Sequence, residues 1–213
     1  MDIENEIRQL DNLILEMAGV VEKNLSYAID VYLNYDVGKF YPPVNDEKVN
    51  AYERWIESDA LHLMIKERLY ADDLRKVTGI MSMVQDLERL GDHAKDVLEF
   101  SLKLKNQSKG NDRIKKLTDY VMKMVHDSIQ SYIHRDIALA REVILSDDHV
   151  DNEYDSLIKS LIQEDSAKEN SSAYTVFTAL VVKYLERIAD HSTNIAEWVI
   201  YILSGYYKDK QII

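Results

Sequence analysis

Apolar positions recur along most of the chain at steps of three and four residues. One stretch shows the pattern most clearly, at Ile80, Val84, Leu87, Gly91, Ala94 and Leu98. This spacing predicts an amphipathic helix with one face packed against other helices. The small residues in the series would let a neighbouring helix approach closely. Only six glycines and two prolines occur in 213 residues, which leaves little room for hairpins or glycine-rich loops. The pattern predicts an all-α protein.

Breaks in the pattern divide the chain into six helical segments, three in each half. Pro42 and Pro43 separate the first two, because proline cannot continue a helix interior. Gly205 is the expected stop of the last helix. Short polar residues that can cap a helix start are Asn45 or Asp46, Asp72 or Asp73, and Ser146 or Asp147. The expected helices cover about residues 3–36, 46–70, 72–105, 112–145, 147–165 and 170–205.

The second half of the chain repeats the first. Residues 87–92 read Leu-Glu-Arg-Leu-Gly-Asp and residues 185–190 read Leu-Glu-Arg-Ile-Ala-Asp, each followed by a histidine and separated by 98 residues. A weaker match pairs Asp46-Glu-Lys-Val-Asn50 with Asp147-Asp-His-Val-Asp151, 101 residues later. Two matches in the same order with nearly the same offset indicate a tandem duplication.

The duplication predicts two tandem three-helix bundles. The polar, glycine-containing stretch 106–112 is the best linker candidate. We therefore expect the first repeat at residues 1–108 and the second at residues 109–213. How the two bundles dock is not contained in the periodicity.

The net charge of −12 narrows the classes of partner. It argues against nucleic acids, which reward a basic surface, and against an anionic membrane surface. It suits cations and basic protein patches, although the same charge also favours solubility. The absence of cysteine excludes thiolate sites and fits a reducing cytoplasm. With no signal-peptide pattern and no apolar run long enough for a bilayer, we expect a cytoplasmic protein that does not insert into membranes.

Acidic side chains form a stripe on one face of the third and sixth expected helices. The first stripe contains Glu88, Asp92, Asp96 and Glu99, and the second contains Glu186, Asp190, Asn194 and Glu197. Each step of four residues turns by only about 40° and rises about 6 Å, so each set shares one face. Shorter stripes, Asp46 with Asn50 and Asp147 with Asp151, lie near the expected starts of the second and fifth helices.

Such stripes point to a cation. Like charges four residues apart cost about 0.2–0.5 kcal/mol per pair on an exposed helix. Two stripes on neighbouring helices would supply four or more oxygen donors, which Mg²⁺, Mn²⁺ or iron accept. The alternative is a solvated acidic face with ion pairs to Arg89, Lys95, Lys183 and Arg187. Recurrence of the stripe in both halves favours a metal site.

The sequence shows no clear catalytic motif and no histidine metal site. His93 and His191 follow the key aspartates, but adjacent residues on a helix point about 100° apart, so we interpret both as packing residues. No histidine has a glutamate three residues before it, which removes the Glu-x-x-His signature of di-iron bundles. No triad, P-loop, glycine-rich cradle or arginine cluster is evident. We expect a protein that is not an enzyme. A carboxylate-bridged metalloenzyme or metal-storage bundle is the alternative.

The repeated segments resemble a known family. Residues 87–94 and 185–197 resemble the two signature segments of PhoU proteins, and residues 71–75 resemble the family's short Asp-Leu-Arg element. The acid pairs at residues 46–50 and 147–151 resemble its repeated pair at the start of each middle helix. The resemblance covers essentially the whole chain.

The resemblance implies a regulatory accessory protein of phosphate uptake and phosphate signalling, often a homodimer. It would restrain a high-affinity phosphate transporter, with the transporter's ATPase subunit and a phosphate-sensing histidine kinase as partners. Some relatives hold iron or other divalent metals on the acid stripes, so Fe, Mn, Mg or Zn is the expected cofactor. The implied ligands are Asp46, Asn50, Glu88 and Asp92 in the first half, and Asp147, Asp151, Glu186 and Asp190 in the second. Asn50, Asn194 and Pro42-Pro43 depart from the family pattern.

Overall fold

The described part of the chain folds into six long helices followed by a very short hairpin. The computed structural model describes residues 3–34, 44–104, 112–166, 172–208 and 210–211. Within these residues the elements are α1 (Ile3–Asn34), α2 (Asp46–Lys66), α3 (Ala71–Leu104), α4 (Asp112–His134), α5 (Ile137–Ser166), α6 (Ser172–Ser204), β1 (Tyr206–Tyr207) and β2 (Lys210–Gln211). The all-α prediction is confirmed. The proline pair and almost all of the expected linker lie outside the described residues.

Two of the predicted helix ends are confirmed by their local geometry. The side chain of Asn45 accepts a hydrogen bond from the backbone N–H of Lys48 at 3.0 Å and so caps α2. Gly205 ends α6 with a φ of 81°, a backbone conformation that glycine adopts without strain. Asp72 and Asp73 do not cap α3; they lie in its first turn, where acidic side chains complement the helix dipole.

The predicted break at Ser146 and Asp147 is wrong. α4 ends at His134 and α5 begins at Ile137, so Asp147 lies inside α5. The side chain of Asp136 caps α5 by accepting from the N–H groups of the second and third residues after it, at 2.9 and 3.1 Å. Ser146 instead donates to the carbonyl of Glu142 at 2.8 Å, a bond within the helix.

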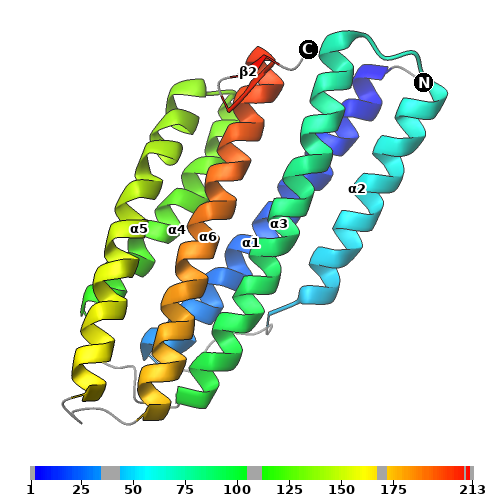
Figure 1. Ribbon diagram of the computed structural model, residues 1–213. Coiled ribbons are helices and arrows are strands. Elements are labelled where there is room, and N and C mark those ends of the chain that lie inside the picture. The colour runs from blue at the N-terminus through cyan, green and yellow to red at the C-terminus, as the bar shows by residue number, and fades with distance from the viewer. Residues whose placement is uncertain (1–2, 35–43, 105–111, 167–171, 209, 212–213) are drawn as a thin grey trace.

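The two three-helix bundles, α1–α3 and α4–α6, lie side by side, and α3 and α6 form most of the contact between them (Figure 1). Phe100 near the end of α3 stacks on Phe177 near the start of α6, with ring centroids 6.2 Å apart. At the other end, Arg75 Nε donates to the carbonyl oxygen of Ile202 at 3.2 Å. α3 and α6 therefore run antiparallel, and we call their contact the seam.

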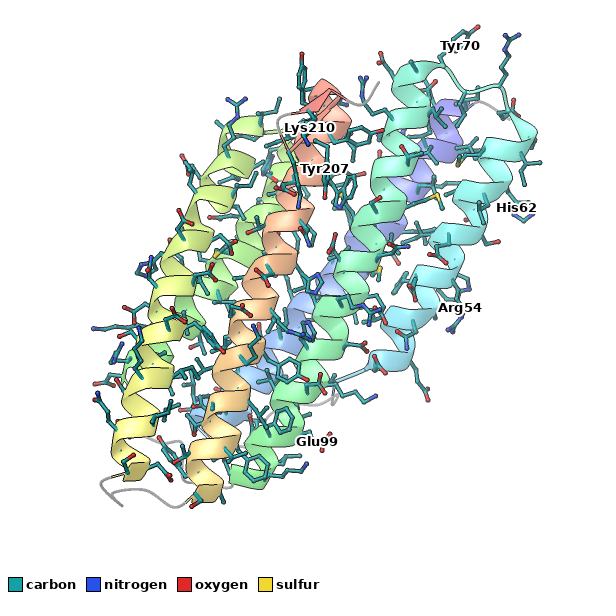
Figure 2. The ribbon with its side chains drawn as sticks, viewed as in Figure 1. Arg54, His62, Tyr70, Glu99, Tyr207 and Lys210 are labelled. Atoms are coloured by element: carbon teal, nitrogen blue, oxygen red, sulfur yellow. The ribbon has the colours of Figure 1, made fainter. Side chains whose placement is uncertain are left out.

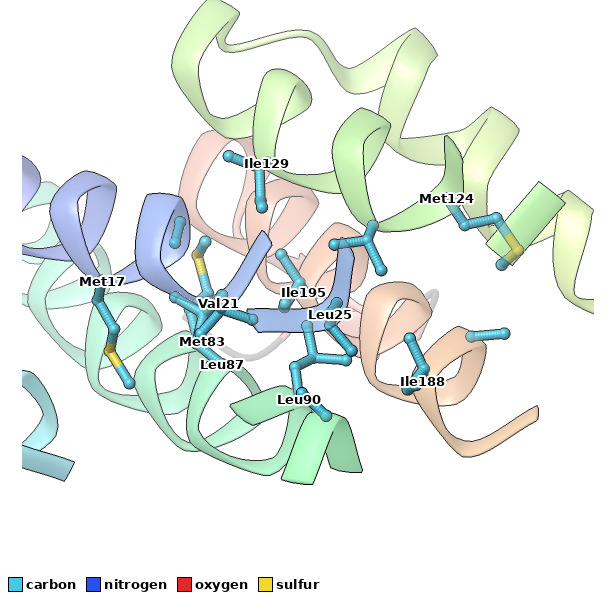
Figure 3. Packing of buried hydrophobic residues seen from close by; sticks show 14 of the residues in the cluster. Met17, Val21, Leu25, Met83, Leu87, Leu90, Met124, Ile129, Ile188 and Ile195 are labelled. Atoms are coloured by element: carbon cyan, nitrogen blue, oxygen red, sulfur yellow. The ribbon is translucent and has the colours of Figure 1, made fainter. Parts of the chain in front are cut away.

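One hydrophobic core continues through both bundles. Leu25 of α1, Leu90 of α3 and Ile188 of α6 are all buried within it (Figure 3). A Cβ atom added at Gly79 would lie 2.3 Å from Cγ1 of Ile202, so the side chain of Ile202 already fills the space above this glycine. Such close packing fixes the position of α6 on α3.

The outer surface carries polar side chains and the terminal hairpin. Arg54 and His62 project outward from α2, and Tyr207 and Lys210 lie beside the end of α6 (Figure 2). No helix among the described residues is both long enough and apolar enough to cross a membrane.

Candidate functional site

The two histidines of the repeated segments meet at the seam. The rings of His93 on α3 and His191 on α6 are 5.3 Å apart, centroid to centroid. These residues are equivalent in the two repeats. Equivalent residues of two antiparallel helices meet only near a local twofold axis, so that axis passes close to the histidine pair. The candidate ligands lie on the two sides of it.

The candidate ligands of the first half face one another across α2 and α3. Burial raises the pKa of Glu88, and the nearby charges of Asp92 and Asp46 raise it further, against the opposing charge of Arg89. Oδ2 of Asp46 accepts from Nζ of Lys95 at 3.1 Å. Among the described residues, Oδ1 of Asp46 and Oδ1 of Asn50 are buried and have no hydrogen-bond partner. A lysine of α3 therefore already neutralises part of this group.

The candidate ligands of the second half face one another across α5 and α6. Burial, followed by the charges of Asp190 and Asp151, raises the pKa of Asp147 to about 6. Burial and the charges of Glu186 and Asp151 also raise the pKa of Asp190. Oδ1 of Asp147 is buried with no hydrogen-bond partner among the described residues. The four carboxylates lie close enough to repel one another.

The side chains do not converge on one point in either half. Among the described residues, no three histidine, aspartate or glutamate side chains form a group that could hold a metal ion. The donors fit a hard cation in kind, because they are carboxylate and amide oxygens and three of them have no partner. The arrangement of these donors does not fit a cation, because the side chains would first have to rotate toward one point. The metal site stays a prediction.

Some ion pairs expected of a solvated acidic face are present. Lys183 Nζ lies 2.6 Å from a carboxylate oxygen of Glu186, and Arg89 lies 3.5 Å from Glu88 and 3.6 Å from Asp92. Arg187, by contrast, makes no ion pair with any carboxylate that the structure describes. Glu88, Asp92 and Glu186 thus have ion-pair partners, whereas Asp147, Asp151 and Asp190 have none among the described residues.

Asp86 is a residue that sequence reasoning missed. Its Oδ1 accepts from Nδ1 of His191 at 2.8 Å and from Nδ2 of Asn194 at 3.2 Å, and its Oδ2 accepts from Nε1 of Trp198 at 3.1 Å. Three donors of α6 thus meet one carboxylate of α3. The repeat gave no sign of Asp86, because the equivalent residue 98 positions later is Tyr184 and not an acid. Only the docking of the bundles reveals its role.

His93 has a different environment from its counterpart. Its side chain is 8% exposed, and neither ring nitrogen has a hydrogen-bond partner among the described residues. Burial, together with the charges of His191, Arg187 and Arg89, lowers the pKa of His93 to about 4. The arginine cluster that the linear sequence did not show is thus formed in space by one arginine from each repeat.

Helix order, duplication and the paired acidic faces together define a class: a two-repeat helical protein whose three-helix bundles dock through an antiparallel seam. A model of the PhoU domain matches residues 14–101 and again residues 114–199, one match in each bundle. The chain belongs to the PhoU family, and the resemblance inferred from the sequence is confirmed.

Similar proteins correspond to the chain over nearly its whole length. A Clostridium acetobutylicum protein named phosphate-specific transport system accessory protein PhoU homolog is 31% identical, covering 97% of this chain and 96% of its own. The Pseudomonas aeruginosa homolog of that name is 29% identical, covering 94% and 84%.

Solved structures agree with the fold. The crystal structure of PhoU from Pseudomonas aeruginosa has a TM-score of 0.89 and 27% identity, covering 96% of this chain and 100% of its own. The phosphate transport system regulatory protein PhoU from Streptococcus pneumoniae has a TM-score of 0.83 and 23% identity, covering 98% and 100%. The second likeness supports the fold alone.

Proposed function

We propose that this chain is a non-enzymatic accessory regulator of phosphate uptake, which restrains a high-affinity phosphate transporter and relays phosphate status to a sensor histidine kinase. The observation that carries the proposal is the family match in both bundles, combined with near full-length correspondence to proteins named as accessory proteins of a phosphate-specific transport system. The alternative of a metalloenzyme or storage bundle would gain support from turnover that Glu88→Ala abolishes.

The partners in this proposal are the transporter's ATPase subunit and the kinase. An ATPase subunit works on the cytoplasmic face of a membrane, so the regulator would act in the cytoplasm, as a homodimer if it follows the family. The net charge of −12 supports docking through basic patches on these partners. Charged residues at the edge of an interface affect the rate at which two proteins associate more than their final affinity.

A metal on the acidic stripes is the second part of the proposal. Asp46, Asn50, Glu88 and Asp92 would hold it in the first half, and Asp147, Asp151, Glu186 and Asp190 in the second. The partnerless oxygens of Asp46, Asn50 and Asp147 support this set. The ion would offset the repulsion among the carboxylates and join α2 to α3 or α5 to α6.

A deletion strain tests the regulatory role. We expect loss of this protein to leave phosphate uptake and the phosphate-starvation response active in phosphate-rich medium, and plasmid-borne wild type to repress both. Purification of tagged protein from the complemented strain should recover the transporter's ATPase subunit. Normal repression of uptake in the deletion strain would contradict the proposal.

Elemental analysis tests the metal. Protein purified without chelator should carry Fe, Mn or Zn in stoichiometric amount, and Glu186→Gln/Asp190→Asn should lose most of it. Asp155→Asn is the control, because Asp155 is an exposed acid of the neighbouring α5 helix and is not among the proposed ligands. Equal metal contents in all three proteins would place the ion elsewhere.

A further inference from the structure

A cleft of about 690 Å³ crosses the seam from α3 over α6 to α5. Arg89 and His93 line it from α3, Arg187, His191 and Asp190 from α6, and Asp147 from α5. Glu197 and Lys208 line it as well, so basic and acidic side chains share one cleft, and each repeat contributes one arginine to it.

His93 is a buried polar side chain at the wall of this cleft. The residue is 6% exposed, and both of its ring nitrogens lack a hydrogen-bond partner among the described residues. Its nearest carboxylate oxygen, on Asp96, is 3.9 Å from Nδ1, which is too far for a hydrogen bond. Buried polar side chains in folded proteins nearly always have a partner. A neutral imidazole carries one N–H that can donate to a ligand in the cleft.

Arg187 and Arg89 are available to the same ligand. Arg187 makes no ion pair with any carboxylate in the described part of the chain, and Arg89 approaches its two carboxylates no closer than 3.5 Å. Both guanidinium-bearing residues line the same cleft as His93. A planar guanidinium offers paired N–H donors that match the oxygens of a phosphate-like anion. Lys208, also in the cleft, is 3.3 Å from Glu197 and so is already paired.

We propose that this cleft binds a small tetrahedral oxyanion, such as inorganic phosphate, between Arg89, Arg187 and His93. Because each repeat supplies one arginine, the site exists only when the two bundles are docked. Binding would therefore draw α3 and α6 together. The proposal goes beyond the regulatory role and does not depend on which partners the protein has.

Isothermal titration of the full chain with inorganic phosphate tests this site, in buffer containing EDTA. We expect one phosphate per chain. Arg187→Gln should weaken binding by roughly tenfold or more, as for loss of a charged hydrogen-bond donor. His93→Phe keeps the ring contacts, removes both nitrogens and should weaken binding by roughly threefold to tenfold. Arg54→Gln, at an outward-pointing arginine of α2, should bind as wild type does (Figure 2).

A second titration with AMP shows whether the site takes free phosphate or the phosphoryl group of a small compound. AMP binding with the same dependence on Arg187 would mean that the site takes phosphoryl groups of small compounds, and binding of phosphate but not AMP would mean the free anion. Both results support the proposal. No phosphate binding, equal binding by Arg187→Gln, or binding that appears only without EDTA would overturn it. An Arg187→Gln protein that loses phosphate but still represses uptake would leave the regulatory role intact.

Discussion

The two groups of candidate ligands descend from one repeated unit, yet they are not electrostatically equal. In the first, Asn50 is neutral and Lys95 reaches across from α3 to Asp46 at 3.1 Å. In the second, Asp151 stands at the position that corresponds to Asn50, and Thr193 stands 98 residues after Lys95. The second group thus has one more negative charge and no lysine at that position, and the pKa of Asp147 is raised to about 6. Each group has one lysine, Lys95 at Asp46 and Lys183 at Glu186, but among the described residues Asp147 makes no ion pair.

A divalent cation should stabilise the protein chiefly through the second group. At a hundredfold excess over its Kd, an ion that binds only the folded state adds about 2.7 kcal/mol, or roughly 5–10 °C in Tm for a chain of this size. Thermal melting with Mn²⁺ against EDTA measures the shift. We expect Asp147→Asn/Asp190→Asn and Thr193→Lys each to lose it, and Asp46→Asn/Asp92→Asn to keep most of it. If only Asp46→Asn/Asp92→Asn lost the Mn²⁺-dependent shift in Tm, the first group would be the main cation site.

The pH dependence of stability should differ between the halves through Asp147. Its pKa rises from 3.8 to about 6, so the folded state holds this proton more tightly than the unfolded chain does. This tighter proton binding stabilises the folded state fully below about pH 4, and the stabilisation is lost as the pH rises through about 6. In EDTA, Asp147→Asn should therefore match wild type at pH 4 and exceed it by roughly 2 kcal/mol at pH 7. Urea unfolding at both pH values measures this, with Asp155→Asn as the control.

The two seam histidines should respond oppositely to the same substitution. His191→Phe removes a donor from Asp86 and should cost about 1.5 kcal/mol, the lower end for a hydrogen bond to a charged group. His93→Phe removes two nitrogens that have no hydrogen-bond partner in the described structure, and should raise the free energy of unfolding by about 1 kcal/mol. Chemical denaturation without added phosphate compares them. A destabilised His93→Phe protein would reveal a partner for His93.

The smallest expected effect on stability concerns Gly91 and its equivalent in the second repeat, Ala189. A Cβ at Gly91 would lie 3.0 Å from Cγ1 of Val49, so Gly91→Ala should lose about 1 kcal/mol by overpacking instead of gaining helix propensity. Ala189→Gly, 98 residues later, should lose about 1 kcal/mol for the opposite reason. Urea midpoints of both variants test this. A stabilised Gly91→Ala protein would show that Val49 moves aside.

Features set by local spacing were predictable from the sequence. The three- and four-residue steps predicted α3, and Asn45 was one of two candidates for the start of α2. The grouping of acids in each half came from the family resemblance and not from spacing. The break at Ser146 and Asp147 was predicted because both are short polar residues that can cap a helix. The apolar series continues through Ala140, Val143 and Val150, all buried, and Asp136 was overlooked as the cap.

Features set by docking were not predictable in this way. The bond from His191 to Asp86 and the presence of Arg187 beside His93 in one cleft join residues about a hundred positions apart. No helical period relates them, because they depend on the direction in which α6 lies against α3. The two-residue strands β1 and β2 are too short to produce an alternating pattern.

The histidine contact at the seam has a consequence for how such a protein can change over generations. Had the halves been separate copies of one chain, every substitution at their interface would occur twice, once in each copy. Joining two copies in a single gene removes that constraint. In this chain His191 bonds to the carboxylate of Asp86, whereas the position that corresponds to Asp86 in the second repeat holds Tyr184. The fused chain can therefore give two originally identical surfaces different tasks.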